Sequence, residues 1–310
     1  MAGWRIRVAG HRRGMAHMNL WKPIAATGLG LALSAGGVAL WPVLGAEPAA
    51  IPIFSPDNGT GWVAGVLEGV SPTGQDFLQP PSGPGPVTFD KAHPYVDDAA
   101  ARRDGKQPTF RVADLSNPIL QPWVREALRK ANDRALSGKP AFTPKERCWP
   151  IGVPGFLLYP VTPIYFLQTP KEVVMIWDED HMARHVYLTD RHSPNPKPSW
   201  FGESIGHYEG DTLVIDTIGL NDRTFVDSFR TPHTTQLHVV ERYRIIEGGK
   251  TLEASVHVED PGAFTTPWNA MQRYRRVTNR TMSEQECAEN NSSWFGYDVD
   301  PIPQADKADF

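Results

Sequence analysis

The first candidate for chemistry is a Gly-x-Ser-x-Gly pattern at residues 202–206, which places Ser204 where many hydrolases carry a nucleophile. Such a nucleophile stands on a strained turn between a strand and a helix. Here the pattern is followed by a turn-forming Glu209-Gly210-Asp211 and by a run of β-branched residues at 212–218. The segment therefore predicts a β-hairpin, in which Ser204 is an ordinary strand residue.

A second candidate is Asp216, a carboxylate inside an otherwise apolar strand. Burying a charge without a partner is costly, so such groups tend to be paired or functional. If the strand face that Asp216 shares with Val214 and Ile218 points into a lumen, desolvation raises the pKa of Asp216 and suits it to proton transfer. The alternative is an outward Asp216, or a salt bridge to Arg242 or Arg184.

Two histidines, His233 and His238, lie five residues apart. They could meet where a loop enters a strand, as an acid–base pair or a metal site requires. No His-Glu-x-x-His pattern accompanies them, and we predict no metal. By strand alternation His238 shares a face with Arg242, while Glu241 takes the other face. An inward row of His238 and Arg242 facing Asp216 would combine acid–base groups with a cation.

Other side chains are secondary candidates. Arg184 could stabilise an oxyanion or a carboxylate, as Arg242 could. The histidines at 185, 192 and 207 read as surface or packing residues. Several aromatic residues could line a pocket, although at strand spacing they are more often core: Trp177, Trp200, Tyr208, Tyr243 and Trp268.

The elements that position these groups are strands with a period of two. We predict strands at 164–167, 172–177, 184–188, 199–208, 212–218, 237–246, 251–259 and 271–277. Short acidic and glycine-containing turns connect several of them, which indicates an antiparallel meander. The predicted fold is mainly β, a lipocalin-like barrel or a sandwich.

Residues 111–310 form the predicted domain, which begins with one amphipathic helix at 118–137. Asn117 is the expected cap and Gly138 the expected stop. The apolar side of this helix is predicted to hold Ile119, Trp123, Ala127, Leu128, Ala131 and Leu136. Before the domain, residues 47–110 are rich in Pro, Gly and Asp, which is typical of an extended arm.

Residues 1–46 read as a targeting segment. Arginines and a lysine precede a small, apolar run at 23–44, and Leu44-Gly45-Ala46 offers a cleavage site. We expect a signal peptide; the alternative is an uncleaved anchor, since the run approaches the roughly 20 residues of a bilayer span. Either reading predicts a periplasmic or secreted protein. In that oxidising setting Cys148 and Cys287 are expected to form a disulfide, the alternative being two separate buried thiols.

The composition narrows the function class. The chain has 310 residues, 40% of them hydrophobic, and a formal net charge of −4 with both signs mixed along its length. No basic face for nucleic acid is predicted. No Rossmann or P-loop glycine pattern occurs, so we expect chemistry without a cofactor.

Several ordered motifs resemble an uncharacterised family of exported bacterial proteins. They are the segments at 147–150, 168–170, 184–187, 200–217, 232–233, 237–242 and 259–261. Relatives in that family commonly read Trp-Glu-Gly-Asp-Thr where this chain has Tyr208 before Glu209-Gly210-Asp211. The resemblance implies an exported β-rich protein and implies no reaction.

Two functional hypotheses follow. The first is a ligand-binding barrel that acts as a cofactor-free lyase, hydratase or isomerase on a small hydrophobic or aromatic compound. In it Asp216 with His233 or His238 moves protons, and Arg242 or Arg184 stabilises an anion. The second is a non-catalytic small-molecule binding protein. A purely structural envelope protein is a third reading, which a filled barrel interior would favour. A membrane contact is expected only through an uncleaved N-terminal segment.

Overall fold

The computed structural model describes residues 51–57, 59–64, 76–95, 108, 110–139, 143–158, 162–178, 180, 182–284 and 287, and the backbone of 293–294 and 297–298. The predicted targeting segment at 1–46 and parts of the predicted arm lie outside these residues. Within them, no helix has both the length and the apolar character to cross a membrane.

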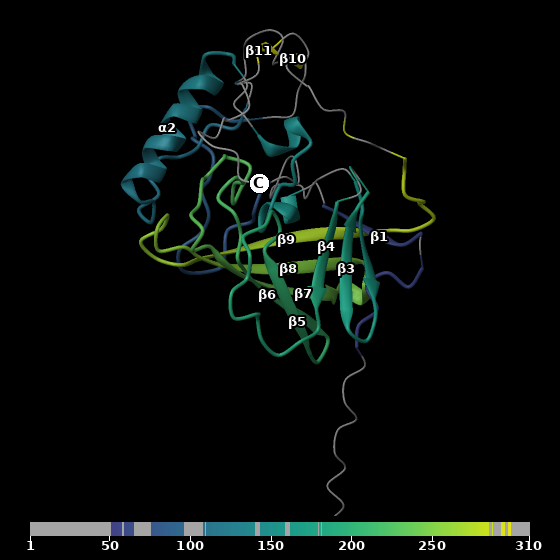
Figure 1. The fold of residues 1–310 in the computed structure, drawn as a ribbon. Helices are drawn as coiled ribbons and strands as arrows, with labels where there is room; N and C mark the ends of the chain where they lie inside the picture. The colour runs from purple at the N-terminus through teal and green to yellow at the C-terminus, as the bar shows by residue number, and fades with distance from the viewer. Residues whose placement is uncertain are drawn as a thin grey trace, which may run out of the picture. The chain divides into compact units, whose positions relative to one another are not determined.

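The strands close into a barrel in the order β1 to β9 (Figure 1). Their bounds are β1 Gly61–Ala64, β2 Ile164–Gln168, β3 Glu172–Trp177, β4 Ala183–Tyr187, β5 Glu203–Glu209, β6 Thr212–Ile218, β7 His238–Ile246, β8 Thr251–Glu259 and β9 Trp268–Val277. The predicted barrel alternative is confirmed. All eight predicted strands are present, with ends shifted by a few residues. A separate two-stranded pair is formed by β10 Ser293–Trp294 and β11 Tyr297–Asp298.

The strand that closes the barrel comes from the predicted arm. β1 pairs antiparallel with both β2 and β9, in register from Gly61↔Val277 to Ala64↔Tyr274 on the β9 side. Its Trp62 is buried and donates from Nε1 to the carbonyl of Phe54 at 3.0 Å. The sequence prediction did not include β1, because four residues without alternating polarity do not stand out in a segment rich in Pro and Gly.

The barrel has one parallel seam. β4 and β5 run parallel and share only the register pairs Val186↔Ser204 and Tyr187↔Ile205. Parallel neighbours need a crossover connection, which is usually a helix. Here residues 188–202 make it without one. Only two register pairs therefore join β4 to β5 at this seam.

The Gly-x-Ser-x-Gly pattern begins at this seam and is explained by packing. Gly202 has a φ of +64°, and a Cβ there would lie 2.4 Å from the carbonyl oxygen of Ile218. A Cβ on Gly206 would lie 2.8 Å from Cγ1 of Val186 across the seam. Ser204 between them is a buried residue of β5, followed by a hairpin. The prediction of an ordinary strand serine is confirmed.

The helix α2 spans Pro122–Leu136 and lies outside the barrel (Figure 1). It begins four residues later than predicted: Gln121 is the N-cap, and Asn117 instead accepts a hydrogen bond from the amide of Ile119 at 3.2 Å. Its buried side also differs from the prediction and comprises Val124, Leu128, Asn132 and Ala135. Trp123 and Leu136, predicted to be covered, are 44% and 46% exposed.

Asn132 explains the difference in the buried side of α2. Its side chain accepts from the amide of Ala113 at 2.8 Å and donates to the carbonyl of the same residue at 2.9 Å. A buried polar group is stable when its hydrogen bonds are satisfied. The side chain of Asn132 thus occupies a core position, although a search for apolar residues would place Asn132 on the surface.

Two 3₁₀ helices, η1 Pro144–Arg147 and η2 Gly155–Leu158, lie between α2 and the barrel strands in the sequence. η2 covers one end of the barrel: its Phe156 carbonyl accepts from Trp177 Nε1 at 2.7 Å, and its Leu157 carbonyl accepts from the Tyr274 hydroxyl at 2.8 Å. We call η1, η2 and the segments packed on them the cap. A third 3₁₀ turn, η4 Glu247–Gly249, joins β7 and β8.

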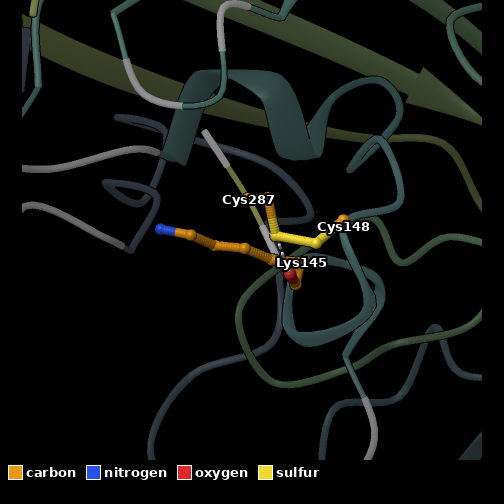
Figure 2. Close-up of a disulfide and its surroundings, with 3 residues drawn as sticks. All are labelled: Lys145, Cys148 and Cys287. Atoms are coloured by element: carbon orange, nitrogen blue, oxygen red, sulfur yellow. Dashed lines mark hydrogen bonds between the residues drawn. A yellow bond between two sulfur atoms is a disulfide. The ribbon is translucent and has the colours of Figure 1, made fainter. Parts of the chain in front are cut away.

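A disulfide joins Cys148 to Cys287, as predicted (Figure 2). Cys148 directly follows η1, and Figure 2 shows the bridge beside Lys145 of that turn. The two cysteines are 139 residues apart. The bridge therefore links the cap to the segment that follows the last barrel strand.

We expect Gly206→Ala to destabilise the fold by about 1–3 kcal/mol, because the added methyl group has to displace Val186 or bend the seam. Urea unfolding of both proteins measures this difference. The matched control is Gly59→Ala, whose new Cβ would meet nothing closer than 3.5 Å. Equal stability of the two variants would contradict the packing explanation.

Candidate functional site

An ion pair lies inside the barrel, beneath the cap. Arg184 of β4 donates from Nη1 to Oε1 of Glu241 at 3.0 Å, and its Nη2 contacts the other carboxylate oxygen. Ser204 and Thr217 accept from the same guanidinium at 3.2 and 2.8 Å. The hydroxyl of Tyr243 donates to Glu241 at 2.8 Å, and burial raises the pKa of Tyr243 well above 10, so this donor stays protonated. Every partner of the buried charges is thus supplied by the protein.

Large side chains surround this ion pair and occupy the interior. Phe156 lies 5.6 Å from Trp177 between ring centroids and 5.8 Å from the guanidinium carbon of Arg184, while Phe166 packs 5.7 Å from Tyr243. Each of these side chains is no more than about 1% exposed. Trp177, Tyr243 and Trp268, considered for an aromatic pocket, are core residues. The barrel interior around the ion pair is therefore filled, which is the feature expected of a purely structural envelope protein.

Asp216 faces outward, which is the alternative to the lumenal orientation considered from the sequence. Leu213, Ile215 and Thr217 of β6 are buried, and Asp216 between the last two is 39% exposed. Its partners are neither Arg242 nor Arg184. Oδ1 of Asp216 lies 2.9 Å from Nε2 of His192 and 3.1 Å from Nε2 of His238.

These contacts continue on both sides into a line of acids and histidines on the outer barrel surface. Nδ1 of His192 lies 3.1 Å from Glu203, and Nδ1 of His238 lies 3.5 Å from Glu259. Nε2 of His257 contacts the other oxygen of Glu259 at 2.9 Å. We call this set the carboxylate–imidazole row; it comprises Glu203, His192, Asp216, His238, Glu259 and His257.

The row favours a charged imidazole at His238. A neutral imidazole has one N–H and one acceptor nitrogen, whereas an imidazolium donates from both. Both nitrogens of His238 face carboxylates, so its doubly donating form satisfies both contacts. The hydrogen bond to Asp216, aided by Glu259, raises the pKa of His238, and the same bond lowers the pKa of Asp216. Among the described residues no group of acids, histidines and cysteines is arranged to hold a metal ion.

The remaining predicted site residues do not join Asp216 and His238. His233 is buried: its Nδ1 lies 3.0 Å from the carbonyl of Thr234, to which it must donate, so Nε2 accepts from the Thr224 hydroxyl at 2.9 Å. Burial lowers the pKa of His233, in keeping with this neutral form. Arg242 is on the outer face, in an ion pair with Glu209. Arg184 is inside the barrel.

A cavity of about 180 Å³ lies in the cap. We call it the cap cavity. Its walls come from the segment before α2, from η1 and η2, and from the loop between β6 and β7. The lining residues are Phe110, Arg111, Thr143, Pro144, Lys145, Ile151, Gly155, Leu158, Phe225, Asp227, Ser228 and Arg230.

The polar groups of the cap cavity are held in place. The guanidinium of Arg230 lies 5.1 Å from the Phe110 ring centroid, and its Nη2 donates to the carbonyl of Arg111 at 3.1 Å. Asp227 accepts from the Thr231 hydroxyl at 2.6 Å and from the amide of Phe229 at 2.9 Å. Burial nevertheless raises the pKa of Asp227 to about 6. The cavity therefore combines apolar walls with a few ordered polar groups.

Sequence reasoning missed most of this arrangement. Glu203, Glu259 and His257 were not singled out, although His257 and Glu259 stand two apart on one strand, which places them on one face. No sequence pattern indicated the cap cavity, because its walls come from four separate segments of the chain.

We expect Glu241→Gln to destabilise the fold by about 3–5 kcal/mol, because it leaves the buried Arg184 charge without a counter-ion. Chemical unfolding at neutral pH measures the loss. Glu209→Gln is the matched control: it breaks the exposed pair with Arg242 on the outer face of the same barrel and should leave stability nearly unchanged. A Glu241→Gln protein as stable as the control would show that the interior pair is dispensable.

We also expect His238 to titrate above the usual histidine pKa of about 6.5, and Asp216→Asn to bring its pKa down. A histidine whose pKa is raised by folding stabilises the protein fully below about pH 6.5, and this contribution disappears as the pH rises through the folded-state pKa. Asp216→Asn should therefore destabilise the protein more at pH 5 than at pH 9. NMR titration of His238 and unfolding at both pH values test this. An unchanged His238 pKa in Asp216→Asn would refute it.

No protein-family model matches the chain, and no curated protein or solved structure matches it either. The function is therefore inferred from the geometry of the site.

Proposed function

We propose that this protein is an exported β-barrel binding protein that holds a small hydrophobic or aromatic compound in the cap cavity. The observation that carries the proposal is the contrast between a filled barrel interior and an open space in the cap. Ligand sites in proteins are concave, mostly apolar and furnished with a few polar groups that orient the ligand. The cap cavity has these properties.

The size of the cavity supports a compact ligand. An apolar cavity of roughly 150 Å³ holds a benzene molecule, and the cap cavity has about 180 Å³. Phe110, Ile151, Leu158 and Phe225 supply apolar walls. A single ring with a short substituent matches this space.

The polar groups support recognition of a substituent. Arg111 and Arg230 line the cavity together with Asp227. Arg111 is fixed by Asp76, whose Oδ1 accepts from Nε at 2.6 Å, and its guanidinium carbon lies 4.8 Å from the Tyr95 ring centroid. Because these side chains are already ordered, they can orient a polar group with little further loss of entropy.

The arrangement favours binding over acid–base catalysis. Asp216 and His238 meet, but both imidazole nitrogens of His238 contact carboxylates, and His233 lies elsewhere. Arg184 and Arg242 each serve an ion pair. A lyase, hydratase or isomerase needs a base and an anion stabiliser at one ligand.

Export is part of the proposal. The disulfide between Cys148 and Cys287 supports it, because such bridges persist mainly in oxidising compartments. The basic and apolar character of residues 1–46 points the same way, as does the resemblance to an exported bacterial family. We infer a periplasmic or secreted protein whose partner is a small molecule.

Calorimetry with benzyl alcohol and indole as probes tests the proposal. We expect one site, and a gain of about 2.7 kcal/mol in unfolding free energy at a ligand concentration a hundredfold above Kd. Ile151→Trp should abolish both effects by filling the cavity. Leu167→Trp is the control, because it adds the same ring at an exposed position of β2. Binding that survives Ile151→Trp, or no binding by the unmodified protein, would contradict the proposal.

A further inference from the structure

A second recessed surface lies on the outside of the barrel, over the parallel seam. It has a volume of about 400 Å³ and is wide open to solvent. We call it the seam groove; its lining residues are Lys171, Tyr187, Thr189, Arg191, Ser193, Glu203 and Ile205. It shares none of them with the cap cavity. The seam groove is therefore a separate candidate site.

The topology explains why the groove exists. Tyr187 and Ile205 face each other in the β4–β5 register and form the floor. The crossover at 188–202 leaves this surface uncovered and raises Arg191 and Ser193 along one side. Lys171 stands on another side, where its backbone carbonyl accepts from the amide of Leu188 at 2.9 Å. Two strands, a turn and a loop thus converge on one open surface.

The charged side chains of the groove differ in whether the protein supplies partners for them. Glu203 accepts from the Ser193 hydroxyl and amide at 2.6 and 2.7 Å and also contacts His192. Within the part of the chain that the structure describes, the side chains of Lys171 and Arg191 make no ion pair or hydrogen bond. The hydrogen bonds from Ser193 hold Glu203 in its ionised form, while two cations, which outnumber this one acid, remain available to an anion.

The floor of the groove is an aromatic platform. Tyr187 is 48% exposed, and its ring stacks with His185 at a centroid distance of 6.4 Å and an interplanar angle of 22°. Nδ1 of His185 contacts Glu172 at 2.5 Å, which fixes the second ring. An exposed ring held from one side offers its edge or face to a ligand at low entropic cost.

We propose that the seam groove binds an acidic oligosaccharide built from uronate residues. The sugar ring would pack on Tyr187 and Ile205, and its carboxylate would lie between Lys171 and Arg191. Thr189 and Ser193 offer hydroxyl groups to the sugar hydroxyls. Because the groove is open to solvent, a chain can enter and leave it without strain, which suits a polymer better than a compact molecule.

The test is calorimetry of the full chain with trigalacturonate, and with maltotriose as the neutral probe. We expect binding of trigalacturonate only. Lys171→Gln/Arg191→Gln should raise its Kd about tenfold or more, which corresponds to about 1.4 kcal/mol or more, since both charge-assisted contacts to the carboxylate are lost. Tyr187→Leu keeps the charges and should raise Kd about fivefold through loss of the ring.

Lys250→Gln/Arg275→Gln is the matched control, because it removes the same charge from another part of the barrel. It should change Kd by less than about twofold. Equal binding of maltotriose, equal weakening by the control pair, or displacement by inorganic phosphate at the same concentration would overturn the proposal. Equal binding of maltotriose would show that Lys171 and Arg191 do not recognise the carboxylate. Either of the other two outcomes would show that the barrel attracts anions non-specifically. Ile151→Trp should leave trigalacturonate binding intact, so this result and that for the cap cavity are independent.

Discussion

The ion pair between Arg184 and Glu241 is the constraint on which the rest of the structure depends. It lies beside the parallel seam between β4 and β5, where only two register pairs join the strands. Through Ser204 and Thr217 the guanidinium connects four neighbouring strands from the inside. Burying two charges is costly, and only a complete set of partners offsets that cost. The pair therefore specifies one closure of the barrel, and its volume, with that of the surrounding rings, fills the lumen.

A filled lumen determines where function can reside. Since side chains alternate along a strand, an inward Thr217 and Glu241 require an outward Asp216 and Val240. Asp216 and His238 are thereby moved to the outer surface, where they pair with each other in the carboxylate–imidazole row. Among the described residues, the cap cavity and the seam groove are two concave surfaces outside the lumen, and irregular segments attached to the barrel contribute to both. This division of roles is common, because loops tolerate the variation that recognition requires.

The sequence predicted the strands well but left the orientation of their faces open, for one physical reason. Alternation is visible in 251–259 and 238–246, so the strands there were identified nearly to the residue. In β6, however, both faces carry branched apolar residues, and the inward face includes Thr217 while the outward face includes Val214, which is itself buried. Polarity could not then tell inside from outside. Asn132 misled the helix prediction similarly, because a satisfied amide behaves as a core residue. β1 was too short and too poor in pattern to be seen.

The disulfide acts on the cap rather than on the barrel. The backbone ladder and the interior ion pair hold the barrel strands, whereas η1 is a turn of only four residues. Cys148 follows this turn directly, and Pro144 and Lys145 of the turn line the cap cavity. The covalent bridge to Cys287 thus restrains a wall of the cap cavity. Order in the cap cavity is consequently coupled to the disulfide, so that the proposed binding site and the proposed oxidising location depend on the same bond.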